Sequence, residues 1–364
     1  MKYEEIERSQ TAPTRYWHIV ENGRVQCDLC PRFCQLKEGQ RGLCYVRANQ
    51  NNKIVLTSYG RSSGFCVDPI EKKPLNHFLP GSAVFSFGTA GCNLSCKFCQ
   101  NWDISKSRQM DTLADQASPQ QIAIAAQNSG CSSVAFTYND PVIFHEYAID
   151  VAQACEALNI KTVAVSAGYV CAEPRAEFYR YMDAANIDLK AFTDTFYHQL
   201  TGSHLQPVLD TLVYLKHETN VWLEITTLLI PGQNDSEEEI EQMTQWIINH
   251  LGNEVPLHFS AFHPDYKMRN IERTSTKILT RARTIALKNG LKYVYTGNVV
   301  DIKGQSTYCS NCSNLIIGRD QYQITDWLLK GQGICQHCGN LCPGVFEPEP
   351  GQWGSKRLPI QMNR

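Results

Sequence analysis

The chain has 364 residues, of which 43% are hydrophobic and 19% charged, and its formal net charge is −2. This composition is ordinary for a globular protein, and the length favours one large domain with appendages. The near-neutral charge argues against a strongly cationic nucleic-acid binder. The sequence shows no apolar run long enough for a membrane span and no signal-peptide pattern at its start, so we expect a cytoplasmic protein without membrane contact.

Cysteine is unusually frequent, with 16 residues. A reducing compartment keeps such residues as thiols rather than disulfides. Most of them cluster in three groups, and clustered thiols indicate metal binding. We therefore expect structural metal in some groups and reactive metal in one.

The first group follows a polar arm, residues 1–20, for which a short helix is predicted. Four thiols fall within eighteen residues, punctuated by proline and glycine: Cys27, Cys30, Cys34 and Cys44. Such a knuckle binds zinc or an iron–sulfur cluster, and the spacing does not choose between a structural and a redox role. Residues 54–59 resemble a short strand, and residues 66–75 a loop. We assign residues 1–80 to an N-terminal Cys-rich module.

The second group is Cys92, Cys96 and Cys99, with spacing C-x3-C-x2-C directly after the strand-like run 83–88. Iron–sulfur clusters are usually held by four thiolates, so a compact group of three leaves one iron free to bind something else. A structural metal site is the alternative, but zinc motifs more often come as C-x2-C pairs. The triplet resembles the signature of the radical SAM superfamily, in which the open iron of a 4Fe-4S cluster chelates S-adenosylmethionine.

Short apolar or β-branched runs alternate with helical patterns between residues 83 and 300. Such runs are typical of parallel strands buried on both faces. The strand candidates are residues 83–88, 133–138, 161–166, 186–190, 221–229, 257–261 and 293–295. About six β-α repeats are too few for a closed eight-fold barrel, so an open, partial (β/α)6 barrel within an α/β fold is predicted for residues 81–300. This is also the architecture that the radical SAM resemblance implies.

Two of the helices carry start signals. Ser118 and Gln121 form a capping box with proline at the first helical position, and Ser236 and Glu239 form a second box. Gly252 is the expected end of the second helix.

Active residues of a parallel β/α barrel collect at the carboxyl ends of its strands. The second strand ends at Asp140, which either caps the next helix or, as the resemblance implies, binds the amino group of the cofactor. Ser166 ends the third strand, either in a plain turn or near the cofactor's ribose. Asp188 and Lys190 end the fourth, and Lys190 pairs with either Asp188 or the cofactor carboxylate. His263, before a proline at the sixth strand's end, is a further candidate.

The third cysteine group lies in residues 301–364, which we assign to a zinc-ribbon-like module and tail. Cys309 and Cys312, and then Cys335 and Cys338, form two C-x2-C pairs separated by 22 residues. Two such pairs indicate tetrahedral zinc, with a second iron–sulfur cluster as the alternative. Cys342 and His337 are surplus ligands.

Several motifs narrow the resemblance. They are the Cys-x2-Cys-Pro-Arg-Phe-Cys knuckle, the run from Asp68 to Leu75, the triplet followed by Gln100-Asn101-Trp102, and Tyr138-Asn139-Asp140-Pro141. Over about residues 25–300 the chain resembles the radical SAM component of the AmmeMemoRadiSam system and, more distantly, pyruvate formate-lyase activating enzymes. One departure is Asp140, where such proteins usually carry Glu.

The resemblance implies an enzyme that reductively cleaves S-adenosylmethionine to a 5′-deoxyadenosyl radical, which abstracts a hydrogen atom from an unidentified substrate. An electron donor such as flavodoxin or ferredoxin and the Memo-like and companion proteins of that system are the implied partners. One alternative is an activase that installs a glycyl radical on a partner protein. Another is a metal-stabilised module that binds nucleic acid or protein without catalysis.

Overall fold

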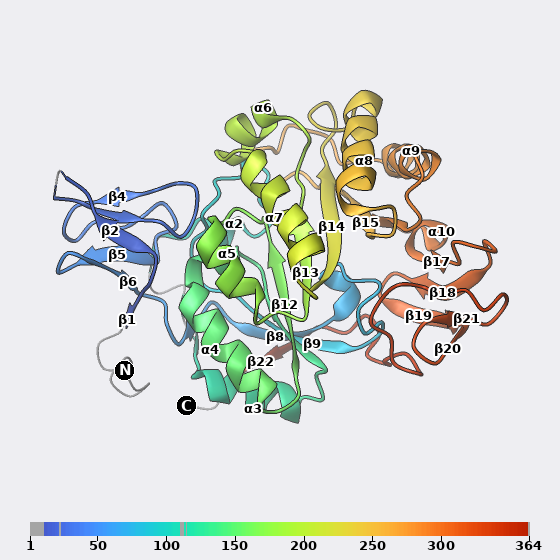
Figure 1. Ribbon diagram of the computed structural model, residues 1–364, viewed down its shortest axis with the longest axis horizontal. Helices are drawn as coiled ribbons and strands as arrows, with labels where there is room; N and C mark the ends of the chain where they lie inside the picture. The colour runs from blue at the N-terminus through green and yellow to red at the C-terminus, as the bar shows by residue number, and fades with distance from the viewer. Residues whose placement is uncertain (1–10, 22, 110–112, 114, 363–364) are drawn as a thin grey trace.

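Figure 1 shows the computed structural model, which describes residues 11–21, 23–109, 113 and 115–362. The first ten residues of the predicted N-terminal arm lie outside these ranges. Two short strands, rather than a helix, occupy the rest of that arm: β1 (Ala12–Pro13) and β2 (Trp17–Ile19).

The N-terminal residues form small antiparallel sheets at one side of the molecule (Figure 1). One sheet has the order β1-β6-β5 and another the order β2-β3-β4. The remaining strands are β3 (Val25–Cys27), β4 (Gln35–Leu36), β5 (Arg47–Gln50) and β6 (Lys53–Leu56). Strand β7 (Arg61–Ser62) pairs separately with β10 (Asp115–Gln116).

A nine-stranded sheet with the order β16-β15-β14-β13-β12-β11-β9-β8-β22 is the centre of the described part of the chain. Seven of its strands are parallel neighbours: β9 (Ala83–Phe87), β11 (Ser133–Phe136), β12 (Lys161–Ser166), β13 (Ala184–Asp188), β14 (Trp222–Leu229), β15 (Leu257–Ala261) and β16 (Val294–Gly297). Each of the first six is followed by a helical segment, so the predicted (β/α)6 architecture is confirmed, with β16 as an additional parallel strand.

Helices cover the outer face of this sheet (Figure 1). Their bounds are α2 (Trp102–Ser105), α3 (Pro119–Asn128), η3 (Pro141–Phe144), α4 (His145–Glu156), α5 (Ala172–Tyr179), α6 (Asp194–Phe196), η4 (Tyr197–Thr201), α7 (Gln206–Glu218), α8 (Glu237–Leu251), α9 (Thr276–Lys288) and α10 (Ile302–Gln305). The apolar sides of these helices, apart from α2 and α10, pack with the outward-facing strand residues in the main hydrophobic core.

The capping predictions are confirmed in part. Ser118 caps α3, and the reciprocal bond of the Gln121 side chain completes its capping box. Ser236 likewise accepts the Glu239 N–H at the start of α8. The Glu239 carboxylate, however, accepts the Phe192 N–H at 2.7 Å, so the second predicted box is only half formed. Helix α8 ends at Leu251, and Gly252 occupies its C-cap, as predicted.

Residues 66–75, predicted as a loop, instead begin with strand β8 (Phe65–Pro69), which pairs antiparallel with β9. Helix η1 (Ile70–Lys72) follows. The sheet wraps around residues 70–80, which we call the interior segment. Apolar side chains of this segment pack against inward-facing residues of four parallel strands: Ile70, Leu75, Phe78 and Leu79 with Val84, Ala135, Val163 and Ala184. The interior segment therefore fills one end of the barrel.

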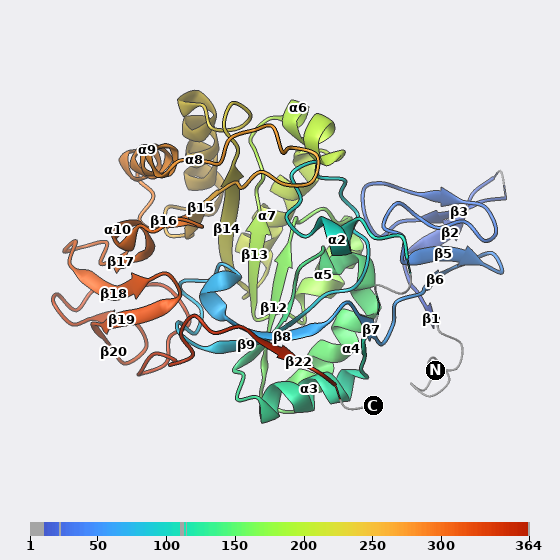
Figure 2. The same cartoon turned by 180° about the vertical axis from the view of Figure 1, so that it is seen from behind.

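The C-terminal residues form a small β-module and then return to the main sheet. The module contains β17 (Thr307–Tyr308), β18 (Leu315–Asp320), β19 (Gln323–Trp327), β20 (Leu329–Lys330) and β21 (Ile334–Cys335). Strand β22 (Leu358–Ile360) then pairs antiparallel with β8, and Figure 2 shows it at the edge of the sheet. Residues near the C-terminal end of the described chain therefore complete one edge of the central sheet.

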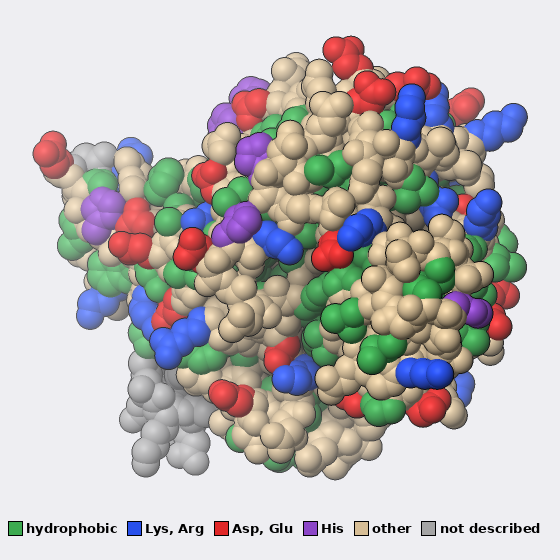
Figure 3. Space-filling model, turned by 45° about the vertical axis from the view of Figure 1, so that its right-hand side comes forward, with side chains coloured by type: hydrophobic (Ala, Val, Ile, Leu, Met, Phe, Trp, Pro, Cys, Tyr) green, Lys and Arg blue, Asp and Glu red, His purple; other side chains and the backbone are tan. Residues whose placement is uncertain are grey.

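On the face shown in Figure 3, Lys and Arg side chains are interspersed with Asp and Glu rather than gathered in one cationic patch. None of the described helices is both long and apolar enough to cross a membrane.

Candidate active site and metal centres

Cys92, Cys96 and Cys99 lie in the segment that joins β9 to α2. We call residues 91–102 the cysteine loop. Since it directly follows the first parallel strand, it lies at the edge where the strands end, which is where barrel enzymes place their active residues. The Cys99 thiol contacts the Ser105 hydroxyl at 3.0 Å, which ties the end of the loop to helix α2.

Hydrogen bonds to the segments after the next two strands hold the beginning of this loop. Asn139 accepts the Thr89 N–H at 3.0 Å and donates to the Gly91 carbonyl at 2.8 Å. The Asn93 amide donates to the Tyr169 carbonyl, after β12, at 2.9 Å. Both side chains are buried, and their hydrogen bonds fix the backbone on either side of the first cysteine. Sequence reasoning treated Asn139 only as part of a motif and missed this positioning role.

The middle and end of the cysteine loop are held by segments that follow β13 and β15. The Ser95 N–H donates to the Thr201 carbonyl at 2.8 Å, and the Lys97 N–H donates to the Leu200 carbonyl at 2.8 Å. Trp102 stacks on Tyr266 at 5.6 Å between ring centroids. Four strand ends therefore converge on one loop, so its thiols have a rigid frame.

Two lysines lie beside the thiols of the cysteine loop. Burial raises the pKa of Cys96 to about 12, while Lys190 and Lys106 act in the opposite direction. Burial also raises the pKa of Cys92, again opposed by Lys106. Metal binding requires thiolates, and neighbouring cations favour that form. Three thiols on one loop, two of them beside a lysine, fit an anionic iron–sulfur cluster that has one iron without a protein ligand.

Asp188 and Lys190 lie on the inner face of the sheet. Asp188 is in register with Thr226 of β14, two positions beyond the inward-facing pair Asn186 and Glu224. Lys190 Nζ donates to the Asp188 carboxylate at 2.8 Å. Burial alone would lower the pKa of Lys190, but Asp188 and Cys96 raise it, so the ammonium stays charged. The structure therefore brings this predicted pair next to the cysteine loop.

Asp140 and Ser166 lie on the opposite face of the sheet. Ser166 is in register with Ile187, a residue of the core between sheet and helices. The Asp140 carboxylate accepts from the Val142 N–H at 3.0 Å, the Ala167 N–H at 2.9 Å and the Ser166 hydroxyl at 3.2 Å. Burial raises its pKa, although these donors stabilise the charged form. The two residues form a clamp between the second and third strand ends.

Two neighbouring cavities open at the ends of β15 and β16 and share Arg273 and Asn298. The first, of about 380 Å³, reaches Gln100 of the cysteine loop and His263. The second, of about 300 Å³, extends past Ser260 toward Glu71 of the interior segment. Together they form an open space that reaches the cysteine loop at Gln100. His263 is exposed and lines this space, and its Nδ1 lies 3.1 Å from the Pro264 carbonyl oxygen.

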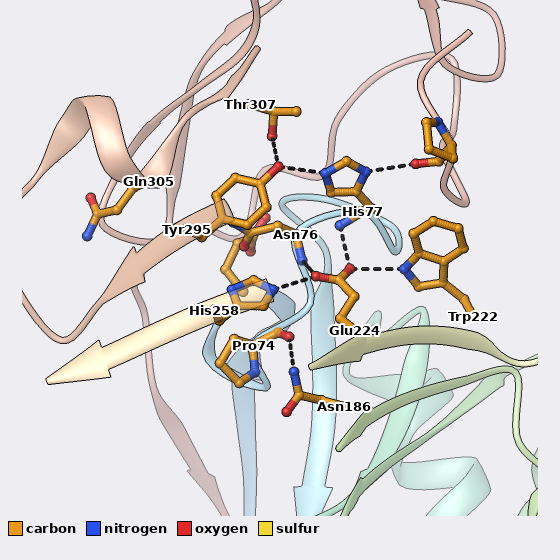
Figure 4. A network of polar contacts seen from close by, with 12 residues as sticks. Pro74, Asn76, His77, Asn186, Trp222, Glu224, His258, Tyr295, Gln305 and Thr307 are labelled. Carbon is orange, nitrogen blue, oxygen red and sulfur yellow. Dashed lines mark hydrogen bonds and ion pairs between the residues drawn. The ribbon is translucent and has the colours of Figure 1, made fainter. Parts of the chain in front are cut away.

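A buried polar network connects the interior segment with the last three parallel strands (Figure 4). The Glu224 carboxylate accepts the Asn76 N–H at 3.0 Å and the His77 N–H at 2.7 Å, and pairs with His258 Nε2 at 2.6 Å. The ring of His77 extends the network to the last parallel strand, because its Nε2 lies 2.6 Å from the Tyr295 hydroxyl. Sequence reasoning missed these residues; a glutamate and a histidine within otherwise apolar strand runs were the available signal.

The C-terminal quartet of Cys309, Cys312, Cys335 and Cys338 has its sulfurs within 4.8 Å of one another. Two of the sulfur pairs are 3.6 and 3.8 Å apart. A tetrahedral zinc with Zn–S bonds of about 2.3 Å holds its sulfurs about 3.8 Å apart, so the geometry fits. Hydrogen bonds from Asn340 and Asn311 lower the pKa of Cys338 to about 6, which favours the thiolate that a metal requires. Cys342 lies elsewhere, 3.7 Å from His77.

The N-terminal quartet of Cys27, Cys30, Cys34 and Cys44 surrounds a third cavity, which is mainly apolar. Its walls include Asn93 of the cysteine loop and the buried Arg47. All four predicted thiols are therefore brought around one cavity. Their sulfurs are not as close to one another as those of the C-terminal quartet, since no three of these described residues have sulfurs that all lie within 4.8 Å.

Comparison with known proteins agrees with this geometry. A family model described as the radical SAM superfamily matches residues 87–246. The protein MJ0808 of Methanocaldococcus jannaschii, described as uncharacterised, is 37% identical over 304 residues, which cover 84% of this chain and 90% of that protein. The pyruvate formate-lyase-activating enzyme of Clostridium pasteurianum is 24% identical over 197 residues, covering 50% of this chain and 81% of that enzyme.

A solved structure, described as a radical SAM methyltransferase from Sphaerobacter thermophilus, has a TM-score of 0.50 and 14% identity and covers 86% of this chain and 84% of that one. This likeness concerns the fold alone. Fold and site together define a partial β/α barrel with a loop of three cysteines at the carboxyl ends of its strands. The chain belongs to the radical SAM superfamily, as the family model and the extensive similarity to the archaeal protein show.

Proposed function

We propose that the chain is an enzyme that reductively cleaves S-adenosylmethionine at a 4Fe-4S cluster held by Cys92, Cys96 and Cys99. The observation that carries this proposal is the convergence of four strand ends on the cysteine loop. Lys106 lies beside its Cys92 and Cys96 thiols, and Lys190 lies beside Cys96. When bound, the cluster supplies one electron to the cofactor, whose cleavage gives methionine and a 5′-deoxyadenosyl radical that takes a hydrogen atom from a substrate.

The chain's own residues bind and orient the cofactor. Lys190, charged and adjacent to the cysteine loop, suits the cofactor carboxylate, and its pairing with Asp188 fixes its position. The Asp140–Ser166 clamp sets the spacing of the second and third strand ends, so its contribution to cofactor binding acts through the backbone at Ala167. The adjoining cavities at β15 and β16 are the proposed substrate entrance. A one-electron protein donor such as flavodoxin or ferredoxin is the proposed source of electrons.

A glycyl-radical activase is the second candidate. It is favoured by the similarity to the activating enzyme of Clostridium pasteurianum, which covers half of this chain. In this case the hydrogen atom would come from a glycine of a partner protein rather than from a small molecule. The C-terminal quartet is proposed to bind structural zinc in either case.

The test is anaerobic reconstitution with iron and sulfide, followed by reduction with dithionite in the presence of S-adenosylmethionine. We expect 5′-deoxyadenosine from the wild type and none from Cys92→Ala, Cys96→Ala or Cys99→Ala. The matched control is Cys131→Ala, because Cys131 is a buried thiol outside all three groups and should leave cleavage unchanged. A wild-type chain that binds a cluster at the loop but never cleaves the cofactor would overturn the proposal and favour a non-catalytic metal module.

A further inference from the structure

The N-terminal quartet and the cysteine loop are packed directly against each other. A Cβ added to Gly91 would lie 2.0 Å from the Cys44 carbonyl oxygen, so the backbones on either side touch. Asn93, on the other side of Cys92, lines the cavity that the quartet surrounds, and Arg32 donates a hydrogen bond to the Asn93 carbonyl. The first cysteine of the loop is thus flanked by residues that contact the quartet.

The cavity has an apolar wall and one buried guanidinium nitrogen without a hydrogen-bond partner among the described residues. Its apolar lining comes from Leu29, Leu36, Val142 and Ile143. Arg47, 1% exposed, also lines the cavity, and its Nη2 pairs with Glu146 at 2.5 Å. Its Nη1 is buried and has no hydrogen-bond partner among the described residues. A buried guanidinium nitrogen needs an acceptor, and an anionic group in the cavity would supply one.

The two cysteine quartets differ in the distances between their sulfurs. In the C-terminal quartet all four sulfurs lie within 4.8 Å of one another, as a single tetrahedral ion requires. Among the described residues, neither the N-terminal quartet nor the cysteine loop contains three sulfurs that all lie within 4.8 Å of one another. A cluster of several irons keeps its ligand sulfurs farther apart because metal and sulfide lie between them. The N-terminal quartet therefore shares its wider spacing with the proposed cluster site rather than with the zinc-like site.

From these three observations we infer that Cys27, Cys30, Cys34 and Cys44 bind a second iron–sulfur cluster, with Arg47 facing its anionic sulfides. The inference does not need the cysteine loop to be catalytic. Its functional consequence does rest on the proposed function: a reduced one-electron carrier protein gives one electron to this cluster and becomes oxidised. The cluster then passes that electron to the one in the cysteine loop and returns to its oxidised form.

The test uses the full chain with Cys92, Cys96 and Cys99 all replaced by Ala, which removes the loop cluster. The protein is purified anaerobically without added metal, and iron, sulfide and zinc are measured per chain, followed by EPR after dithionite reduction. We expect two or four irons, an equal amount of sulfide, one zinc and a reduced-cluster EPR signal. A chain with no iron and two zinc ions would overturn the inference, whether or not the wild type cleaves S-adenosylmethionine.

A second comparison covers the case in which the triple variant does not fold. In the otherwise wild-type chain, Cys30→Ser should lower the iron content by two or four per chain, whereas Cys131→Ser should leave it unchanged. An unchanged iron content in Cys30→Ser, with one zinc lost instead, would contradict the inference. Because the C-terminal quartet is intact in each variant, its metal is a constant internal reference.

Discussion

Glu224 and His258 pair side by side inside the barrel, with 2.6 Å between Glu224 Oε2 and His258 Nε2. The same carboxylate accepts two backbone N–H groups from the interior segment. Burial would raise the pKa of Glu224, but His258 and these donors lower it to about 2. One charged side chain therefore connects two strands with the segment that fills the barrel.

Replacing this carboxylate should strongly destabilise the fold. Glu224→Gln leaves His258 and two backbone donors poorly matched, and removing one partner of a buried pair costs about 3–5 kcal/mol. Urea unfolding followed by circular dichroism measures the change. The control is Glu254→Gln, which removes an exposed ion pair with Lys292 and should cost less than about 1 kcal/mol. Similar losses in the two variants would contradict a special role for Glu224.

A second prediction concerns pH. Burial raises the pKa of Glu71 from 4.5 to about 7, although Arg319 and the Gly81 N–H oppose the shift. The folded chain then holds a proton at Glu71 that the unfolded chain releases above its ordinary pKa. This contribution to stability is fully present below pH 4.5 and is lost as the pH rises through about 7.

The matching experiment compares the wild type with Glu71→Gln by urea unfolding at pH 5 and pH 8. The free energy of unfolding should fall more steeply with pH in the wild type, by on the order of 3 kcal/mol over this range. Equal slopes in the two proteins would show that Glu71 titrates normally.

A third prediction tests the packing between the N-terminal module and the cysteine loop. Gly91 and Gly232 both have positive φ, +82° and +72°, but only at Gly91 would a Cβ collide with backbone. Gly232→Ala should therefore cost only the penalty of the left-handed conformation, about 1–2 kcal/mol. Gly91→Ala should lower the melting temperature further and reduce the iron bound per chain. Equal effects of the two substitutions would contradict the close contact.

A fourth prediction concerns cofactor binding and compares two Asp–Lys pairs of the sheet. Lys190 pairs with Asp188 beside the cysteine loop, whereas Lys161 pairs with Asp183 at the opposite ends of the strands, each at 2.8 Å. Lys190→Gln should weaken S-adenosylmethionine binding at least tenfold, about 1.4 kcal/mol. Lys161→Gln should leave it unchanged. Anaerobic calorimetry with reconstituted protein measures both, and equal affinities would remove Lys190 from the proposed site.

The regular part of the fold was predictable because each buried parallel strand corresponds to a short apolar run in the sequence. All seven predicted core strands are present, with ends that shift by up to two residues, as for residues 184–188. Strand β8 was missed because Asp68 and the lysines that follow it suggested a loop. In the structure Asp68 is buried and pairs with Lys73 at 2.8 Å, and its other partners include the Tyr138 hydroxyl at 2.7 Å. The contact with Tyr138 depends on a residue that is 70 positions away in the chain.

In the candidate site, too, local sequence patterns were predictable, whereas contacts between distant residues were not. The three cysteine groups were found because metal ligands recur at short, fixed spacings. The contact of Asp140 with Ser166, and its position on the helix side of the sheet, depends on the register of β12 against β13. The buried partners of Glu224 come from two strands and the interior segment. No local pattern contains such relationships, so only the folded chain reveals them.

Strand β22 carries a kinetic consequence. Its pairing of Leu358 with Val67 joins residues 291 positions apart (358 minus 67). Contacts of such long range form late, because the chain between them must first be ordered. Until then β8 has an unpaired edge, and open edges recruit strands from other molecules. The yield of correctly folded protein should therefore fall as its concentration during refolding rises, because the open edge of β8 pairs with strands of other molecules.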